Sequence, residues 1–226
     1  MKKVLSLVAA AAILAAATAF AAPVSIVNSK HNLSTSAPTA YAQGSGTTQI
    51  CVYCHTPHNA YTAAPLWNRN GSQYAPSSYT LYSGLNMANV SNKSGFTADS
   101  ISLFCMSCHD GSNLNNIKNQ PVDGSTLYNG PIVNAKAILT TNDPTHDMRS
   151  THPINFEVKV GSETIQSDLK TVNTGNINGL PLFKSSRSAT NTLECSSCHA
   201  VHDNQNAPFL RVTMNGSALC LACHAK

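Results

Sequence analysis

Cys51-Val52-Tyr53-Cys54-His55 is the stretch that decides the fold, because its pattern, C-x-x-C-H, occurs four times in the chain. The four motifs contain all 8 cysteines, and a histidine directly follows each pair. With 9 histidines among 226 residues, four such coincidences have a probability on the order of 10⁻⁶, which indicates one shared chemical purpose. The motif cysteines are Cys51, Cys54, Cys105, Cys108, Cys195, Cys198, Cys220 and Cys223, and the motif histidines are His55, His109, His199 and His224.

Eight cysteines in one chain have two other common explanations, four disulfides or zinc bound by C-x-x-C knuckles. Neither explains the histidine after each pair, whereas C-x-x-C-H is the attachment signature of c-type haem. Two thiols three residues apart lie on one side of a helical turn, so both can form thioethers with a single porphyrin. The adjacent histidine then binds the iron. We therefore predict four covalently bound c-type haems.

The composition fits a protein whose interior is filled by cofactors. Only 11% of the residues are charged and 6% are aromatic, so the chain offers few large apolar side chains for a core. We expect the macrocycles to supply that core. The predicted fold class is a mostly irregular, haem-packed multihaem cytochrome c, with short α-helices at the C-x-x-C-H motifs, long loops and at most one small β-hairpin. Alternation in residues 154–160 places that hairpin.

The N-terminus is typical of a bacterial secretory signal peptide. Lys2 and Lys3 precede an apolar, alanine-rich run, and Ala-Phe-Ala at residues 19–21 is a cleavage pattern. We expect residues 1–22 to be cleaved, leaving a tetrahaem domain over residues 23–226 with an N-terminal arm over residues 23–50. No later segment is long enough and apolar enough to span a membrane. The predicted location is extracellular or at the cell surface, with the periplasm as the alternative.

The charge balance excludes one class of partner. The formal net charge of +4 falls to +2 when the two leader lysines are removed. So weak and dispersed a charge does not predict nucleic-acid binding.

Five histidines outside the motifs are candidates for the sixth ligand of each iron. Four irons need four such ligands, so histidine alone can complete every site and we predict bis-histidine, low-potential haems. A methionine would raise the potential of any haem that it binds. The spare histidines are His31, His58, His146, His152 and His202, and the methionine alternatives are Met87, Met106, Met148 and Met214.

His58 and His202 share one local frame, because each lies three residues after a motif histidine. Two imidazoles on one turn cannot reach opposite faces of the same haem, so the second histidine must serve a different haem. His152, before Pro153, and His146, in turn-like sequence, compete as the ligand from their region. His31 lies alone on the arm, where it can fold back or extend to a neighbouring subunit.

The chain resembles the multihaem c-type cytochromes of metal-reducing bacteria, in the doubled C-x-x-C-H family. The resemblance is carried by S-K-H-N-L-S (residues 29–34), C-V-Y-C-H-T-P-H-N (51–59), C-M-S-C-H-D-G (105–111) and T-H-P-I-N-F (151–156). It implies bis-histidine haems stacked in a continuous chain within an extracellular filament, with one ligand donated by the neighbouring protomer. His31 is the sequence candidate for that ligand. The implied partners are further copies of the chain, upstream periplasmic and outer-membrane cytochromes, and extracellular acceptors such as metal oxides.

The function that these observations predict is electron transfer between closely packed haems, without bond chemistry on a substrate, so no catalytic residue is expected. A monomeric periplasmic tetrahaem shuttle is the first alternative. A multihaem reductase is the second, and it would need an iron with an open sixth position.

Overall fold

The computed structural model describes residues 25–38, 46–72, 74–82, 95–111, 114, 117–127, 130, 139–140, 146–158 and 169–225. The predicted leader and Met87 lie outside these residues, as does the second part of the predicted strand at 154–160. All motif cysteines and all nine histidines lie within them.

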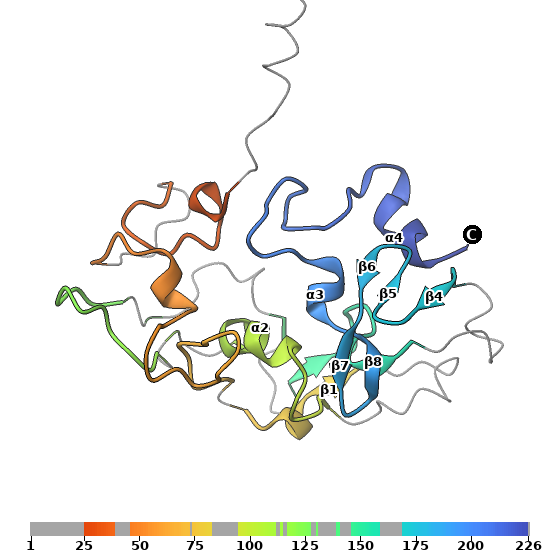
Figure 1. Ribbon diagram of the computed structural model, residues 1–226, viewed down its shortest axis with the longest axis horizontal. Coiled ribbons are helices and arrows are strands. Elements are labelled where there is room, and N and C mark those ends of the chain that lie inside the picture. Colours follow the sequence, from red (N-terminus) through yellow and green to blue (C-terminus); the bar gives the residue numbers. More distant parts are fainter. Residues whose placement is uncertain are drawn as a thin grey trace, which may run out of the picture.

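The helices are short, and most of them carry a C-x-x-C-H motif. Figure 1 shows α2, α3 and α4 following one another from the centre of the molecule to its upper right. None of the helices in the described part of the chain is long and apolar enough to cross a membrane. The α-helices are α2 (Ser102–His109), α3 (Cys195–Cys198) and α4 (Ala218–Cys223), and the 3-10 helices are η1 (Ile26–Asn28), η2 (Cys51–Tyr53), η3 (Pro76–Ser78) and η7 (Asn215–Ser217).

The β-structure corrects the prediction of at most one hairpin, because the described residues form three small sheets. β1 pairs with β2 in parallel, while β3-β8-β7 and β4-β5-β6 are antiparallel. The predicted strand at residues 154–160 is present as β3, which pairs with β8. The strands are β1 (Thr80–Leu81), β2 (Asp147–Met148), β3 (Phe156–Glu157), β4 (Val172–Asn173), β5 (Asn176–Ile177), β6 (Leu180–Pro181), β7 (Phe183–Ser185) and β8 (Ser188–Leu193).

Local turn chemistry explains the additional sheet β4-β5-β6. Asn178 and Gly179 join β5 to β6 and both have positive φ, at 46° and 86°. This conformation is the two-residue hairpin turn for which Asn-Gly is the preferred sequence. The apolar residues on either side, Ile177 and Leu180, pair across the turn and are both buried. Asn-Gly between apolar residues is therefore the sequence signal that predicts this hairpin.

Two separate apolar clusters take the place of one continuous core in the described residues. The first joins β4, β5, β6 and β8 to α4, and the second joins β1, β2 and α2. The buried apolar side chains therefore form two small clusters. Neither cluster includes a residue of the motif segments α3 and η2. The first cluster comprises Val158, Val172, Ile177, Leu180, Leu182, Leu193 and Ala222, and the second comprises Tyr79, Leu81, Phe96, Met106 and Met148.

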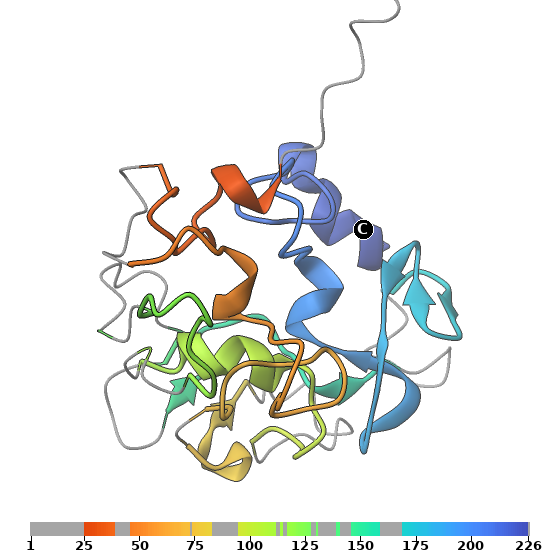
Figure 2. The same ribbon diagram turned by 60° about the vertical axis from the view of Figure 1, so that its left-hand side comes forward.

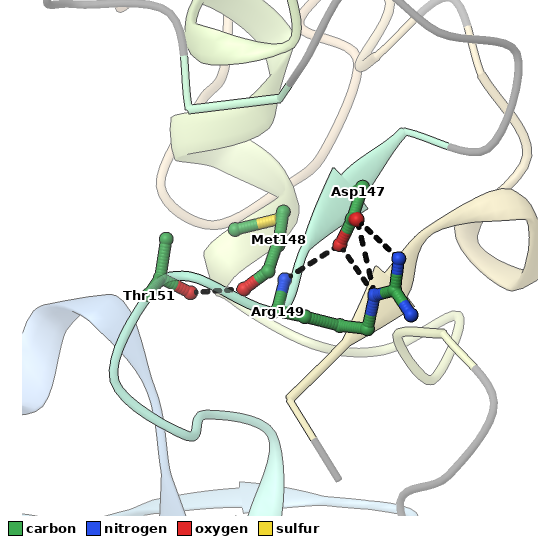
Figure 3. Close-up of polar contacts among 4 residues, drawn as sticks. All are labelled: Asp147, Met148, Arg149 and Thr151. Carbon is green, nitrogen blue, oxygen red and sulfur yellow. Dashed lines mark hydrogen bonds and ion pairs between the residues drawn. The ribbon is translucent and has the colours of Figure 1, made fainter.

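The second cluster accounts for two of the methionines considered as ligands. Met106 and Met148 are both fully buried in it. Figure 3 shows Met148 on one side of its strand and the ion pair of its neighbours, Asp147 and Arg149, on the other. The hydrogen bonds from Arg149 lower the pKa of the half-buried Asp147 to about 2. This alternation directs the thioether of Met148 into the apolar cluster.

Candidate haem-binding site

The eight motif cysteines are all free thiols, and none is joined in a disulfide. Three of the four motifs have a common backbone turn. The amide N–H groups of His55, His199 and His224 each donate to the carbonyl of the first motif cysteine four residues earlier, at 2.8, 3.1 and 2.8 Å. A bond of this kind closes one α-helical turn and places the two cysteines on the same side. His109 is instead the last residue of α2.

Three motif histidines each have a non-motif histidine facing them at nearly the same distance. The ring centroids of His109 and His31 are 6.1 Å apart. His55 and His202 are 6.0 Å apart. His224 and His152 are 6.5 Å apart.

These distances test whether the residues fit a haem iron held between two imidazoles. A metal–imidazole bond is about 2 Å long, and a five-membered ring with bonds near 1.35 Å has its nitrogen about 1.15 Å from its centre. Two imidazoles on opposite sides of one metal ion therefore have centroids roughly 6.3 Å apart. All three pairs lie within a few tenths of an ångström of that value, so the residues fit bis-histidine ligation of haem.

Backbone carbonyls fix the orientation of several of these imidazoles. Nδ1 of His55 is 2.7 Å from the carbonyl oxygen of Pro65, and Nδ1 of His199 is 3.1 Å from that of Pro208. Nδ1 of His152 is 2.8 Å from the carbonyl oxygen of Pro153. A carbonyl only accepts, so Nδ1 carries the proton in each ring and Nε2 is left as the metal-binding nitrogen.

The first and third motifs lie in two loops with the same structure, residues 51–68 and 195–211. Both loops contain an Ala-Pro cis peptide followed by a residue with φ of 60°, which is Leu66 in one and Phe209 in the other. Thr56 N donates to the Leu66 carbonyl at 2.9 Å, and Ala200 N donates to the Phe209 carbonyl at 2.7 Å. The sequence signal for this repeat is an Ala-Pro pair whose proline lies ten residues after His55 and nine residues after His199, a signal that the motif spacing alone does not contain.

The two equivalent histidines of these loops have different surroundings. His202 faces His55 of the first loop, whereas His58 is exposed and makes no ring–ring contact among the described residues. His199 likewise has no ring–ring contact with a histidine within the described part of the chain, although it lies close enough to His31 to lower the pKa of that residue. The structure therefore leaves one motif histidine and one exposed spare histidine without partners of this kind.

The arm places His31 inside its own chain. His31 stacks on Phe209 of the third-motif loop, with ring centroids 4.3 Å apart and planes at 15°. Asn32 next to it is fully buried and donates to the Val27 carbonyl at 2.7 Å. Burial, followed by the nearby His109, lowers the pKa of His31 to about 4, which keeps the imidazole neutral as metal binding requires. In the described fold, the His31 ring lies within its own chain, beside His109 of the second motif.

His146 has aromatic rather than histidine neighbours. Its ring lies 3.6 Å from that of Tyr74 and 5.5 Å from that of Tyr79, measured between centroids. No motif histidine makes a ring contact with it among the described residues. Of the two candidates from this region, His152 therefore has the geometry of a ligand.

Thiols of successive motifs lie next to one another. Burial, and then the thiol of Cys108, raise the pKa of Cys54 to about 12. A hydrogen bond to Cys195 raises the pKa of Cys105 and lowers that of Cys195. The first motif thus interacts electrostatically with the second, and a hydrogen bond links the second to the third.

The third and fourth motifs are joined in the same way. Burial, and then the thiol of Cys223, raise the pKa of Cys198 to about 11. Each motif thus has a thiol that interacts with a thiol of the next motif in the chain.

The C-terminal residues 188–226 match the doubled CXXCH motif family. This match covers the third and fourth motifs with β8, α3 and α4, and no curated protein matches the chain. Together with the facing histidines, it indicates a multihaem c-type cytochrome. Such a protein binds haem covalently through C-x-x-C-H and transfers electrons.

Proposed function

We propose that the protein carries four c-type haems, all bis-histidine ligated, and conducts electrons along them as the subunit of an extracellular filament. The observation that carries the proposal is the set of three histidine pairs at 6.0–6.5 Å, each containing one motif histidine. The series of neighbouring thiols supports a continuous path through the chain.

The haems, when bound, supply the redox chemistry by cycling between ferric and ferrous iron. The chain's own residues place and tune them. The eight thiols hold the porphyrins covalently, and the proline carbonyls orient His55, His152 and His199 so that Nε2 is available. Two imidazole ligands on each iron favour a low potential and leave no open position for a substrate.

The unpaired histidines support a specific junction between subunits. His58 is exposed and occupies the position in its loop that His202 occupies in the other, where His202 serves the opposite loop. His199 is the motif histidine without a facing partner among the described residues. We therefore infer that His58 of one protomer completes the His199 site of the next. This assignment replaces His31, which the fold places beside His109.

A filament of this kind resembles the extracellular assemblies formed by the tetrahaem cytochrome OmcE. In this proposal the leader at residues 1–22 directs export, and the mature protein works at the cell surface. Upstream periplasmic and outer-membrane cytochromes supply electrons, and extracellular acceptors such as metal oxides receive them.

Electron microscopy of the purified holoprotein tests the assembly. We expect wild-type protein to form long regular filaments and His58→Ala to form short ones or none, because the junction ligand is lost. The haem content of each sample, measured by absorbance, is expected to stay at four per chain. His146→Ala is the matched control, since it removes another non-motif histidine and leaves the proposed junction unchanged.

The same images distinguish the alternatives. If filaments were lost in His31→Ala but kept in His58→Ala, the ligand that bridges two subunits would be His31 on the N-terminal arm. If every sample contained only monomers with four haems bound, the result would contradict the filament and support the monomeric periplasmic shuttle. A reductase would instead be indicated by a five-coordinate iron in assembled wild-type protein.

A further inference from the structure

Glu194 is a fully buried carboxylate at the contact between the second and third haem motifs. Its side chain is 1% exposed, and it directly precedes Cys195, the first cysteine of α3. It accepts hydrogen bonds from Ser100 and Ser102 at the start of α2, the helix that carries Cys105. One carboxylate therefore touches both haem-binding helices, which lie side by side in Figures 1 and 2.

The donors around Glu194 are arranged for the charged form. The Ser102 hydroxyl oxygen accepts from Cys195 N at 3.0 Å, so its own proton is directed to the carboxylate. The Ser100 oxygen accepts from Ser102 N at 3.3 Å and donates to Oε2 of Glu194 at 2.7 Å.

The orientation of the third donor, the Asn155 side-chain amide, is fixed by another hydrogen bond. Asn155 Oδ1 accepts from Thr97 N at 2.9 Å, which identifies Nδ2 as the group that donates to Oε1 of Glu194 at 2.9 Å. With the Ser197 backbone amide, which donates to the same side chain in a capping box, four donors point at the carboxylate. Hydrogen bonds of this kind to an ionised acceptor are the strong ones.

The charge of Glu194 has no counterion among the described residues. The ion pair found there is Asp147 with Arg149, and the four hydrogen-bond partners of the Glu194 side chain are neutral. A buried charge acts over a longer range than an exposed one, because little water screens it. Haems attached through Cys195, which directly follows Glu194, and through Cys105 on α2 would lie beside this charge.

We propose that Glu194 is a positioning and tuning residue, a buried anion that lowers the reduction potentials of the haems on the second and third motifs. This inference rests on the proposed haem binding. A fixed negative charge stabilises ferric iron relative to ferrous iron, because the ferric site carries one more positive charge. The two central haems of the series are therefore harder to reduce than their ligands alone would make them.

Redox titration of the holoprotein, followed by haem absorbance, tests this proposal. In Glu194→Gln we expect a shift to higher potential in part of the titration curve, with the four-haem content unchanged. Glu194→Asp keeps the charge and is expected to titrate close to wild type. Asp123→Asn is the control, because it removes one negative charge from an exposed side chain and is expected to leave the curve in place.

The outcomes separate this inference from the proposed function. A wild-type curve in Glu194→Gln with four haems bound would overturn the tuning role and leave haem binding intact. If Glu194→Gln fails to assemble, Glu194→Asp and Glu194→Asn form a second pair that differs only in charge. Equal potentials in that pair would overturn the proposal, and a higher potential in Glu194→Asn would support it. Wild-type protein without haem would instead refute the proposed function.

Discussion

Replacing His152 with alanine is expected to convert one haem in four from six-coordinate low-spin to five-coordinate high-spin iron. His152 faces the motif histidine His224 at 6.5 Å, and Nδ1 of His152 donates to the Pro153 carbonyl. Alanine removes the imidazole that faces His224 at ligand distance. Electron paramagnetic resonance of the oxidised protein measures the change as a new high-spin signal.

The control for this variant is His146→Ala, which distinguishes the two histidines that compete in the sequence. His146 packs on Tyr74 and Tyr79, so its loss is expected to leave the spectrum low-spin. A high-spin signal from His146→Ala, together with an unchanged spectrum from His152→Ala, would reverse the assignment. His202→Ala is expected to behave like His152→Ala, at the haem of His55.

Replacing Cys195 and Cys198 together with alanine is expected to remove one haem completely, lowering the haem content from four to three per chain. Both thioether positions of the third motif are lost, and a single remaining histidine does not hold a haem covalently. Mass spectrometry of the denatured protein measures the difference as the mass of one haem. Ser196→Ala changes the same turn without removing a thiol and is expected to keep all four.

The loss also has a consequence for conduction. Cys195 of the third motif is hydrogen-bonded to Cys105 of the second, and Cys198 of the third interacts electrostatically with Cys223 of the fourth. Removing the haem of the third motif interrupts the series, so electron transfer through the chain is expected to fall steeply. Conduction equal to wild type in a three-haem protein would contradict the linear order.

The pairing of histidines was only partly predictable. The H-x-x-H spacing requires that His202 serves a haem other than its own, and the structure places it opposite His55. Nothing in the local sequence identifies His109 as the partner of His31, since 78 positions separate them. The arm reaches it because His31 stacks on Phe209 and Asn32 is buried beside it.

The β-structure was also only partly predictable from the sequence. Alternation in residues 154–160 predicted a strand, but its partner is β8, more than thirty residues later in the chain. The Asn178-Gly179 turn, by contrast, depends on local chemistry alone, because Asn-Gly between apolar residues favours a two-residue hairpin turn.

The sequence by itself determined the chemistry of this protein, because haem attachment depends on a spacing within one turn of backbone. Five consecutive residues suffice to present two thiols and an imidazole, so four copies of C-x-x-C-H predict the cofactor without knowledge of the fold. Only the tertiary structure decided which histidines face one another, which motifs are neighbours and that Glu194 is buried between two of them. These are contacts between segments distant in the chain, and their geometry depends on how loops, turns and small sheets pack together.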